Sequence, residues 1–328
     1  MKAADVTVVV VPRDHFSDTK ESLESLLEFT RPACPLVYVD GGSPPAIAAY
    51  LREQASAREF KLVRYNHYLT PNQARNIGAA QVDTRYIVFV DNDVVVAPDW
   101  LTTLVDCADA TGAAVVGPLN YERRPLLRTV HFAGGDARIV VTRENGAERH
   151  RLVDRIHKVN VPASPVPTEA AEFHCMLVRT EVFRRLGGLD ENMLSTRENI
   201  DFCLAVQQAG GKIYLDPRSR ITYLPPAPLR MSDVPFFALR WSDLWDLSSF
   251  HHLRDKWQLD EDDYFQRQYA NLGWRRREIM MRGGILRWLV SVRVRVAVER
   301  MLRPLERRLN AALARRHARR HGVQLRPH

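Results

Sequence analysis

The chain has 328 residues, 45% of them hydrophobic and 26% charged, which suits a soluble globular protein of one large domain or two. No stretch approaches about 20 uncharged apolar residues, and Lys2 is the only basic residue before the first apolar run. We therefore expect neither a membrane-spanning helix nor a secretory signal. The four cysteines lie far apart and form no CxxC pair, which favours reduced thiols in a cytoplasmic protein over a disulfide framework or a zinc site.

The net charge of +8 is unevenly distributed along the chain. Residues 274–328 contain 16 arginines, no lysine and three acidic residues, whereas residues 1–273 contain 31 basic and 36 acidic side chains. The body of the chain is therefore mildly acidic, and only the tail is strongly basic. This distribution makes a nucleic acid an unlikely partner.

The first half of the sequence alternates short apolar runs with helical patterns. Residues 6–11 are a β-branched run that stops at Pro12, which is typical of a buried strand. The other expected strands cover 36–39, 60–65 and 86–90. Three helices are expected between them: the first begins at Asp18 or Thr19, and the other two cover 46–57 and 70–80. Strands alternating with helices predict a mostly parallel sheet with helices on both faces.

Acidic residues follow two of these strands. Asp40 comes directly after the second strand, and Asp91 and Asp93 come after the fourth. Because ligands of parallel sheets bind beyond the carboxyl ends of the strands, we expect both acidic sites at one edge. Two aspartates separated by one residue can also share a hard cation such as Mg²⁺ or Mn²⁺. Alone, this pattern is common by chance.

The second half is less regular. Residues 123–166 are rich in Arg, Pro and polar residues, which predicts a loop-rich excursion over the site. Strands are expected at 173–178 and 212–215, and helices at 181–186 and 200–208. Residues 231–273 read as an aromatic-rich helical segment, and 274–328 as a basic amphipathic tail.

A helix motif and an acidic strand-end motif follow each other in the first hundred residues. The block PNQARNIGAA, residues 71–80, precedes the strand that ends in Asp91-Asn92-Asp93. Together they resemble the nucleotide-sugar glycosyltransferases of family 2, and the likeness extends over about 6–226. It includes the turn GGLDE at 187–191 and the helix start ENID at 198–201. Each motif is weak alone, but the set in this order is specific.

The resemblance implies a fold and an activity. The expected fold is α/β of the GT-A type, a Rossmann-like and mostly parallel sheet flanked by helices, with a helical basic C-terminal extension. The GT-A domain would cover 1–230, divided into a nucleotide-sugar half (1–118) and an acceptor half (119–230). The implied reaction moves a sugar from a nucleoside-diphosphate sugar to a hydroxyl of a saccharide or lipid-linked acceptor, with inversion and with Mg²⁺ or Mn²⁺.

The resemblance also implies roles for individual residues in donor binding. Asp40 would bind the nucleobase or ribose, Pro12 and Arg13 would line the base pocket, and Arg75 would approach the ribose or diphosphate. For Asp40 the alternative is an acid in a Gly-rich turn, and for Arg75 a salt bridge on a helix surface.

The motif around the fourth strand would supply the metal ligands. Asp93 would be the direct ligand, and Asp91 would face the ribose or the metal through water. Asn92, between them, would belong to the nucleotide-sugar site. Asn76 and Asn72 would either contact the sugar or only buttress the loop.

The implied catalytic base departs from the family pattern. The usual Glu-Asp pair is Glu198-Asn199 here, so Glu198 is the preferred base and Asp201 the alternative. Acids at a helix start are also stabilised by the helix dipole without any catalytic role. Tyr223 occupies the place of a histidine that often binds the metal in relatives, which predicts weak affinity for free metal. His131 and His174 are expected to be packed or hydrogen-bonded rather than ligands.

The tail mixes arginine with apolar residues over 278–309. We expect a helix that is broken before Pro304 and lies on an anionic membrane surface, which would place the protein at the inner face of the cell membrane. A solvated basic helix or a dimer contact is the alternative. Two other functions stay open: a nucleotidyltransferase, although no Gly-rich loop follows the first strand, and a non-catalytic nucleotide-sugar-binding relative.

Overall fold

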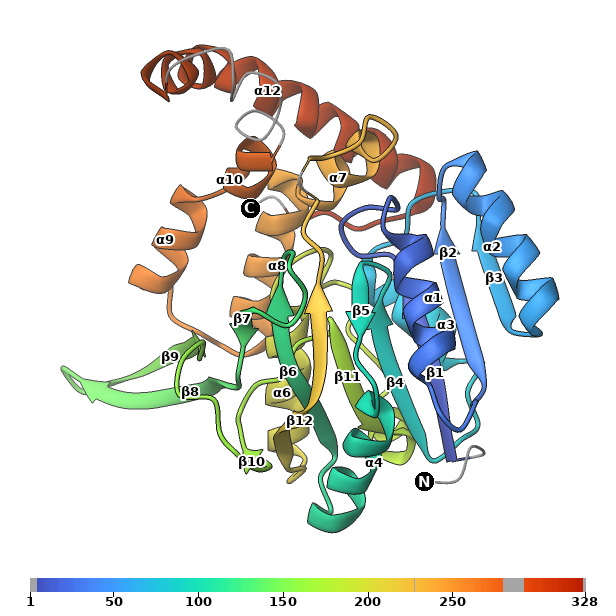
Figure 1. Ribbon diagram of the computed structural model, residues 1–328. Coiled ribbons are helices and arrows are strands. Elements are labelled where there is room, and N and C mark those ends of the chain that lie inside the picture. Colours follow the sequence, from blue (N-terminus) through green and yellow to red (C-terminus); the bar gives the residue numbers. More distant parts are fainter. Residues whose placement is uncertain (1–4, 227, 280–291, 327–328) are drawn as a thin grey trace. The chain divides into compact units, whose positions relative to one another are not determined.

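The computed structural model describes residues 5–226, 228–279 and 292–326 (Figure 1). The chain divides into two compact units. The first comprises Met1–Val140, Leu152–Glu191 and Glu198–Pro225. The second comprises Val141–Arg151, Asn192–Arg197 and Pro226–His328.

A mostly parallel sheet forms the centre of the first unit. Its strands in the described residues are β1 (Val6–Val11), β2 (Leu36–Gly41), β3 (Lys61–Tyr65), β4 (Tyr86–Asp91), β5 (Val94–Val96), β6 (Val115–Glu122), β7 (Thr129–Phe132), β10 (Val166–Pro167), β11 (Cys175–Arg179) and β12 (Ile213–Tyr223). They run in the order β10-β12-β6-β11-β4-β1-β2-β3, with β5 beside β12 and β7 beside β6. Strands β3, β2, β1 and β4 are parallel, as are β6 and β12, whereas β11 is antiparallel to β4 and β6.

Helices cover both faces of this sheet (Figure 1), as the sequence predicts. One face carries α1 (Thr19–Phe29), α2 (Pro45–Arg58) and α4 (Trp100–Thr111); the other carries α3 (Pro71–Ala79), α5 (Thr180–Arg185) and α6 (Glu198–Gln208). The valines of β1 explain the arrangement, because Val8 and Val10 belong to one core cluster while Val9 and Val11 belong to the other. A strand buried on both faces needs a continuous apolar run.

Helix α3 is fixed at its start and along its length. Thr70 caps it through a reciprocal capping box with Gln73, and Pro71 stands at the first helical position, where its missing N–H matters least. Further along, a Cβ atom on Gly78 would lie only 2.3 Å from Val9 Cγ1. Helix α3 therefore lies against β1 at a distance that only glycine permits, which holds the ARNIG segment at the sheet.

The prediction of a loop-rich excursion over 123–166 is wrong for much of its length. Besides β7 and β10, this segment contains β8 (Gly135–Glu144) and β9 (Ala147–Ile156), which form a separate two-stranded sheet. The link between them is Asn145-Gly146, and both residues have positive φ (51° and 80°). An Asn-Gly pair in that conformation favours a tight hairpin, a local signal that outweighs the polar composition of the segment.

The C-terminal part of the second unit is helical in its described residues, and helices lie within 231–273 as the sequence predicts. It contains α7 (Val234–Arg240), α8 (Asp243–Lys256), α9 (Asp263–Ala270), α10 (Trp274–Arg277) and α12 (Val292–His321). The expected break before Pro304 is wrong, since Pro304 lies inside α12. A proline inside a helix removes a backbone donor and crowds the carbonyl four residues earlier, but contacts beyond Pro304 hold the helix. Arg307 Nε donates to Asp243 Oδ2 (2.7 Å), and Asn310 Nδ2 donates to the Ala238 carbonyl (2.7 Å).

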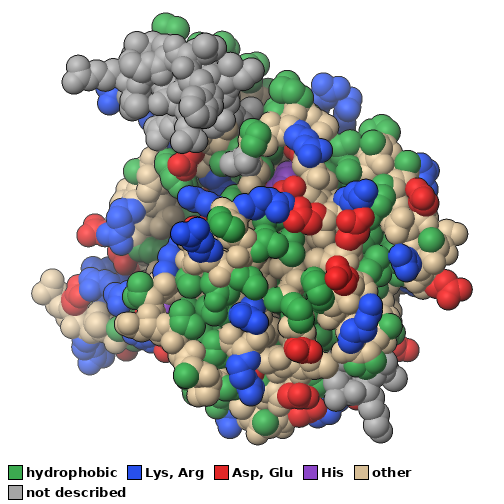
Figure 2. All heavy atoms as spheres, in the orientation of Figure 1, with side chains coloured by type: hydrophobic (Ala, Val, Ile, Leu, Met, Phe, Trp, Pro, Cys, Tyr) green, Lys and Arg blue, Asp and Glu red, His purple; other side chains and the backbone are tan. Residues whose placement is uncertain are grey.

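No helix in the described part of the chain is both long and apolar enough to cross a membrane. On the face drawn in Figure 2, basic and acidic side chains are interspersed with apolar ones. Residues 285–290, whose apolar members support part of the predicted tail helix, lie outside the described residues.

Candidate active site

The expected acidic edge exists in the topology. Strands β2, β1 and β4 are neighbours and run in parallel, so Asp40, Pro12-Arg13 and Asp91 stand at the carboxyl ends of three adjacent strands. In the register of β1 and β4, Val11 pairs with Asp91. The sequence prediction that both acidic sites open at one edge is confirmed.

Asp40 is held in a polar turn after β2. Its Oδ1 accepts from the Ser43 backbone N–H (2.9 Å), and its Oδ2 accepts from Ser43 Oγ (2.9 Å) and from Arg64 Nη1. The carboxylate is therefore buried and oriented by the Gly-rich turn that follows it.

Asn92 ties the end of β4 to the loop after β1. Its Nδ2 donates to the His15 carbonyl (2.8 Å) and to Thr19 Oγ1 (3.0 Å), and its Oδ1 accepts from the Arg13 backbone N–H (2.9 Å). Both ends of this amide bind protein groups. Asn92 thus positions the Arg13 backbone beside the two aspartates.

Asp91 is the centre of a buried ion network. Arg75 Nη2 donates to its Oδ1 (2.9 Å), and the Arg75 guanidinium lies 4.1 Å from the centre of the Phe173 ring. Burial alone would raise the pKa of Asp91, but Arg75, His174 and Arg13 outweigh it and hold that pKa below its usual value. Burial lowers the pKa of Arg75 itself, and the two acids beside it oppose that effect. Both side chains are fully buried, so the structure places Arg75 inside the fold.

Asp93 is a buried carboxylate without hydrogen-bond partners. It lies between β4 and β5, and both of its side-chain oxygens lack a partner among the described residues. Burial raises its pKa well above the usual value, and Asp14 and Asp91 add to the effect, while His15 opposes it. The His15 Nδ1 atom stands 3.7 Å from Asp93 Oδ2. Burying an ionised carboxylate without a partner costs free energy, so Asp93 needs either a proton or a nearby cation.

His174 lies beside the two aspartates. The sequence predicts a packed or hydrogen-bonded histidine at this position rather than a ligand, and its ring does pack on Tyr223. Its Nδ1 lies at ion-pair distance, 3.2 Å, from Asp91 Oδ2, and among the described residues neither atom has a hydrogen-bond partner of regular geometry. Donor atoms of Asp91, Asp93 and His174 all lie within 4.8 Å of one another. Burial lowers the pKa of His174, which favours the neutral imidazole that binds metals. Two carboxylates and one imidazole whose donor atoms converge in this way fit a divalent cation.

Strand register explains how His174 reaches this place. Cys175 of β11 pairs with Val90 of β4, and the Asp91 backbone N–H donates to the His174 carbonyl (3.1 Å). The His174 ring stacks on Tyr223 at 4.2 Å between ring centres. An imidazole thus lies beside Tyr223, although the sequence has no histidine at position 223. In the sequence His174 lies within the strand expected at 173–178, and only the antiparallel pairing of β11 with β4 shows which residues it meets.

The preferred base, Glu198, is paired with arginine. Arg13 Nη1 donates to Glu198 Oε1 (2.7 Å), and Arg75 Nη1 lies 3.9 Å from the same oxygen. Arg13 Nε also lies 3.7 Å from Asp91 Oδ2. Burial would lower the pKa of Arg13, but Glu198, Asp91 and Asp14 raise it above its usual value. Asp201, one turn further along α6, is buried as well.

Asn76 and Asn72 hold the GGLDE turn. Asn76 Nδ2 donates to the Leu189 carbonyl (2.8 Å), and Asn76 Oδ1 accepts from the Leu189 N–H (2.9 Å). Asn72 Nδ2 donates to the Asp190 carbonyl (2.8 Å). The structure therefore favours the buttressing role for both amides, and it connects two motifs that are more than 100 residues apart.

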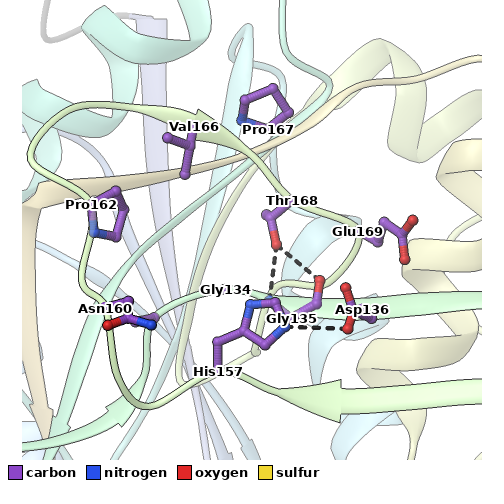
Figure 3. A pocket seen from close by; sticks show the side chains of 11 residues that line it. Gly134, Gly135, Asp136, His157, Asn160, Pro162, Val166, Pro167, Thr168 and Glu169 are labelled. Carbon is purple, nitrogen blue, oxygen red and sulfur yellow. Dashed lines mark hydrogen bonds and ion pairs between the residues drawn. The ribbon is translucent and has the colours of Figure 1, made fainter.

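A separate hollow of about 470 Å³ lies between the segments around β7–β8 and β9–β10 (Figure 3). His157 and Asp136 face each other in it, with 3.2 Å between Nε2 and Oδ2, and Thr168 Oγ1 accepts from the Gly135 N–H. None of the site residues predicted from the sequence lines this hollow.

A sheet of this topology, covered by helices on both faces and carrying two aspartates after a central strand, has the GT-A fold. The crystal structure of GalNAc-T7 with UDP, GalNAc and Mn²⁺ shares it, with a TM-score of 0.52 and 16% identity over 82% of this chain and 57% of that chain. The chain belongs to glycosyl transferase family 2, whose model matches residues 7–187.

Curated relatives match at similar identity. The uncharacterized protein y4gI of Sinorhizobium fredii is 25% identical over 241 residues, 70% of this chain and 25% of that protein. The pre-mycofactocin glycosyltransferase of Mycobacterium tuberculosis is 24% identical over 223 residues, 67% of this chain and 42% of that protein. The O-antigen biosynthesis protein RfbC of Myxococcus xanthus is 25% identical over 245 residues, which are 70% of this chain and 18% of that protein. The chain thus spans less than half the length of these relatives.

Proposed function

We propose that the chain transfers a sugar from a nucleoside-diphosphate sugar to a hydroxyl of a saccharide or lipid-linked acceptor, with inversion and with Mg²⁺ or Mn²⁺. The observation that carries the proposal is the buried carboxylate of Asp93, unpartnered among the described residues, beside Asp91 and His174. Family membership supports the activity, and the name of RfbC supports a role in polysaccharide biosynthesis.

Asp91, Asp93 and His174 would hold the ion. When bound, a divalent cation neutralises a diphosphate leaving group and stabilises the charge that develops as it departs. Two further observations support these ligands: Asp91 Oδ2 and His174 Nδ1 lie 3.2 Å apart with no hydrogen bond of regular geometry from the described residues, and His174 is oriented by its stacking on Tyr223. We no longer expect the weak metal affinity that Tyr223 suggests by itself.

The arginines would have different tasks. Arg75 is fully buried and bound to Asp91, so it positions that carboxylate and holds it ionised. Arg13 is 17% exposed and shared between Glu198 and Asp91, so its guanidinium is the one that can turn to a phosphate. Asp40, oriented by Ser43 and Arg64, would bind the nucleobase or ribose at the neighbouring strand end.

Glu198 would act as the base once Arg13 engages the donor. In the structure Glu198 Oε1 is occupied, because it accepts a hydrogen bond from Arg13 Nη1. A diphosphate that draws Arg13 away would release Glu198 to accept the proton of the acceptor hydroxyl. That oxygen would then attack the anomeric carbon from the face opposite the diphosphate. Asp201 would support Glu198 or bind the acceptor.

The decisive test measures the product of donor turnover with Mn²⁺. Sugar transfer or donor hydrolysis releases nucleoside diphosphate, nucleotidyl transfer releases pyrophosphate, and a binding module releases neither. Asp93→Asn should lower turnover by roughly 100-fold or more, the scale on which removal of a group that stabilises transition-state charge acts. Asp83→Asn, an exposed acid before β4, is the matched control and should keep normal turnover.

Glu198→Gln should reduce transfer to the acceptor far more than donor binding, with Asp201→Asn as its comparison. If only Asp201→Asn has this effect, the base is Asp201. Wild-type turnover in Asp93→Asn would refute the metal assignment.

The lipid-linked acceptor would be reached through α12. Met301, Leu305 and Leu309 recur every four residues on this helix and are 72%, 57% and 64% exposed. Exposed arginines flank this row, among them Arg300 and Arg308. We propose that this apolar row with its flanking arginines contacts an anionic membrane surface.

A further inference from the structure

A second group of potential metal ligands lies beside the aspartates. One donor atom each of His131, Glu172 and His174 lies within 4.8 Å of the others. Their side chains come from β7 and from the segment leading into β11. A register shift brings His131 there, because Asn120 pairs with Phe132 while Tyr121 pairs with Val130. His131 is thus the extra residue of a β-bulge, a feature that commonly re-aims a side chain.

The surroundings of His131 fix its orientation. Its Nδ1 lies 3.0 Å from Glu122 Oε2, and a carboxylate oxygen accepts this hydrogen bond. In the tautomer that donates from Nδ1, the electron pair of Nε2 is available to a metal ion. That Nε2 faces Glu172 Oε2 at 3.5 Å.

Glu172 is oriented in the same manner. Asn120 Nδ2 donates to Glu172 Oε2 (3.2 Å) from β6. A histidine whose second nitrogen binds a carboxylate, beside a carboxylate that is itself hydrogen-bonded, is the usual outer shell of a protein metal site. The two side chains are 17% and 13% exposed, so an ion can reach them from solvent.

We propose that His131, Glu172 and His174 form a binding site for Zn²⁺. Two imidazoles and one carboxylate are a donor set that zinc prefers, whereas Mg²⁺ prefers oxygen alone. Ligand atoms about 2.0–2.1 Å from a tetrahedral zinc ion stand about 3.3 Å apart, close to the 3.5 Å between His131 and Glu172.

This site shares His174 with the aspartates. An ion bound by His131, Glu172 and His174 takes an imidazole away from Asp91 and Asp93. Zinc should therefore weaken the binding of Mn²⁺ to the same protein. The zinc site itself does not depend on the proposed sugar transfer, because it is defined by donor atoms and is measured without any nucleotide sugar.

The experiment titrates the metal-stripped full-length chain with Zn²⁺ against a colorimetric chelator. The wild-type chain should bind zinc through this site, and His131→Gln should lose at least 100-fold in affinity. Glu122→Gln should lose 10- to 100-fold, because it removes only the group that orients His131. Asp93→Asn should bind zinc within twofold of wild type.

His157→Gln is the matched control and should also bind within twofold. His157 pairs with a carboxylate, Asp136, as Figure 3 shows, but among the described residues this pair belongs to no three-ligand group. If His131→Gln misfolds in thermal unfolding without metal, the visible spectrum of Co²⁺ bound to wild type and Glu122→Gln replaces it as the readout. A nitrogen-ligated tetrahedral spectrum is expected in wild type and should weaken in Glu122→Gln.

Three results would overturn the proposal. The first is no zinc binding by the wild-type chain, which would leave His131 as a hydrogen-bonded histidine between two glutamates. The second is wild-type affinity in His131→Gln. The third is loss of zinc in Asp93→Asn with retention in His131→Gln, which would put the ion at the aspartates. None of these results bears on turnover of a sugar donor, so the two proposals fail separately.

Discussion

Arg75 donates a hydrogen bond to Asp91 at 2.9 Å in a place where both side chains are fully buried. The arginine belongs to the ARNIG segment of α3, and the aspartate ends β4. The two motifs that identify the family in the sequence are therefore joined by a buried ion pair. Its removal has consequences for folding that an exposed pair would not have.

Arg75→Leu should lower the free energy of unfolding by about 3–5 kcal/mol, because it leaves Asp91 buried without its main partner. The free energy of unfolding of Arg75→Lys should lie between those of wild type and Arg75→Leu, since an ammonium keeps the charge but loses the planar contact with Phe173. Urea denaturation measures both variants. The control is Arg85→Leu, which breaks an exposed pair with Asp109 and should change stability by no more than about 1 kcal/mol. Equal losses in Arg75→Leu and Arg85→Leu would contradict the prediction.

Gly78→Ala should destabilise the protein, although glycine to alanine within a helix usually stabilises by about 1 kcal/mol. The new Cβ atom would stand 2.3 Å from Val9 Cγ1, so α3 must move away from β1. Overpacking of this kind costs roughly 1–3 kcal/mol. Thermal unfolding gives the sign directly, and a higher melting temperature would show that α3 does not lie this close. Gly117→Ala is a milder comparison, with 3.3 Å to the Ala171 side chain.

Asp246 should make the second unit less stable as the pH rises. It is buried on α8, it accepts a hydrogen bond from Ser195 Oγ, and burial raises its pKa to about 6 from 3.8. The folded state holds the proton of Asp246 more tightly than the unfolded state. The resulting contribution to the free energy of unfolding is therefore fully present below about pH 4. It is lost as the pH rises to about 6, and it amounts to roughly 3 kcal/mol.

Asp246→Asn should remove that part of the pH dependence. Urea denaturation of wild type and variant between pH 4 and pH 7 measures the difference, with Asp255→Asn on the exposed side of the same helix as control. Parallel curves for wild type and Asp246→Asn would show that Asp246 does not titrate in this range.

The apolar row of α12 should govern binding to anionic lipid vesicles. Replacing Met301, Leu305 and Leu309 together by Glu should lower the partition coefficient at least tenfold. The change removes the apolar area that would enter the lipid, and it adds negative charge that the anionic lipid repels. Co-sedimentation with vesicles of phosphatidylglycerol and phosphatidylcholine measures this. The matched control adds three glutamates at exposed apolar residues elsewhere: Ile156, Val159 and Val161. If both triple variants bind vesicles alike, the loss is due to net charge and the row is not the contact.

Several features followed from the sequence because their causes are local. The buried β1 is visible as a β-branched run, the start of α3 as a Thr-Pro cap, and the acidic edge as carboxylates after two apolar runs. The hairpin of β8 and β9 has an equally local cause, the turn at Asn145-Gly146, but the polar composition of residues 123–166 obscures it in the sequence.

The sequence by itself determined the mostly parallel sheet and the place of Asp91 and Asp93 at its edge, because periodicity and turn residues act within a few positions. It also indicated the family, through the resemblance of the motifs at 71–80 and 91–93. Tertiary structure alone decided which side chains join Asp91 and Asp93. His174 reaches Asp91 only through the antiparallel register of β11 on β4, and Arg13 meets Glu198 across 185 positions of the chain. Such contacts depend on strand order and packing, which no local pattern of residues contains.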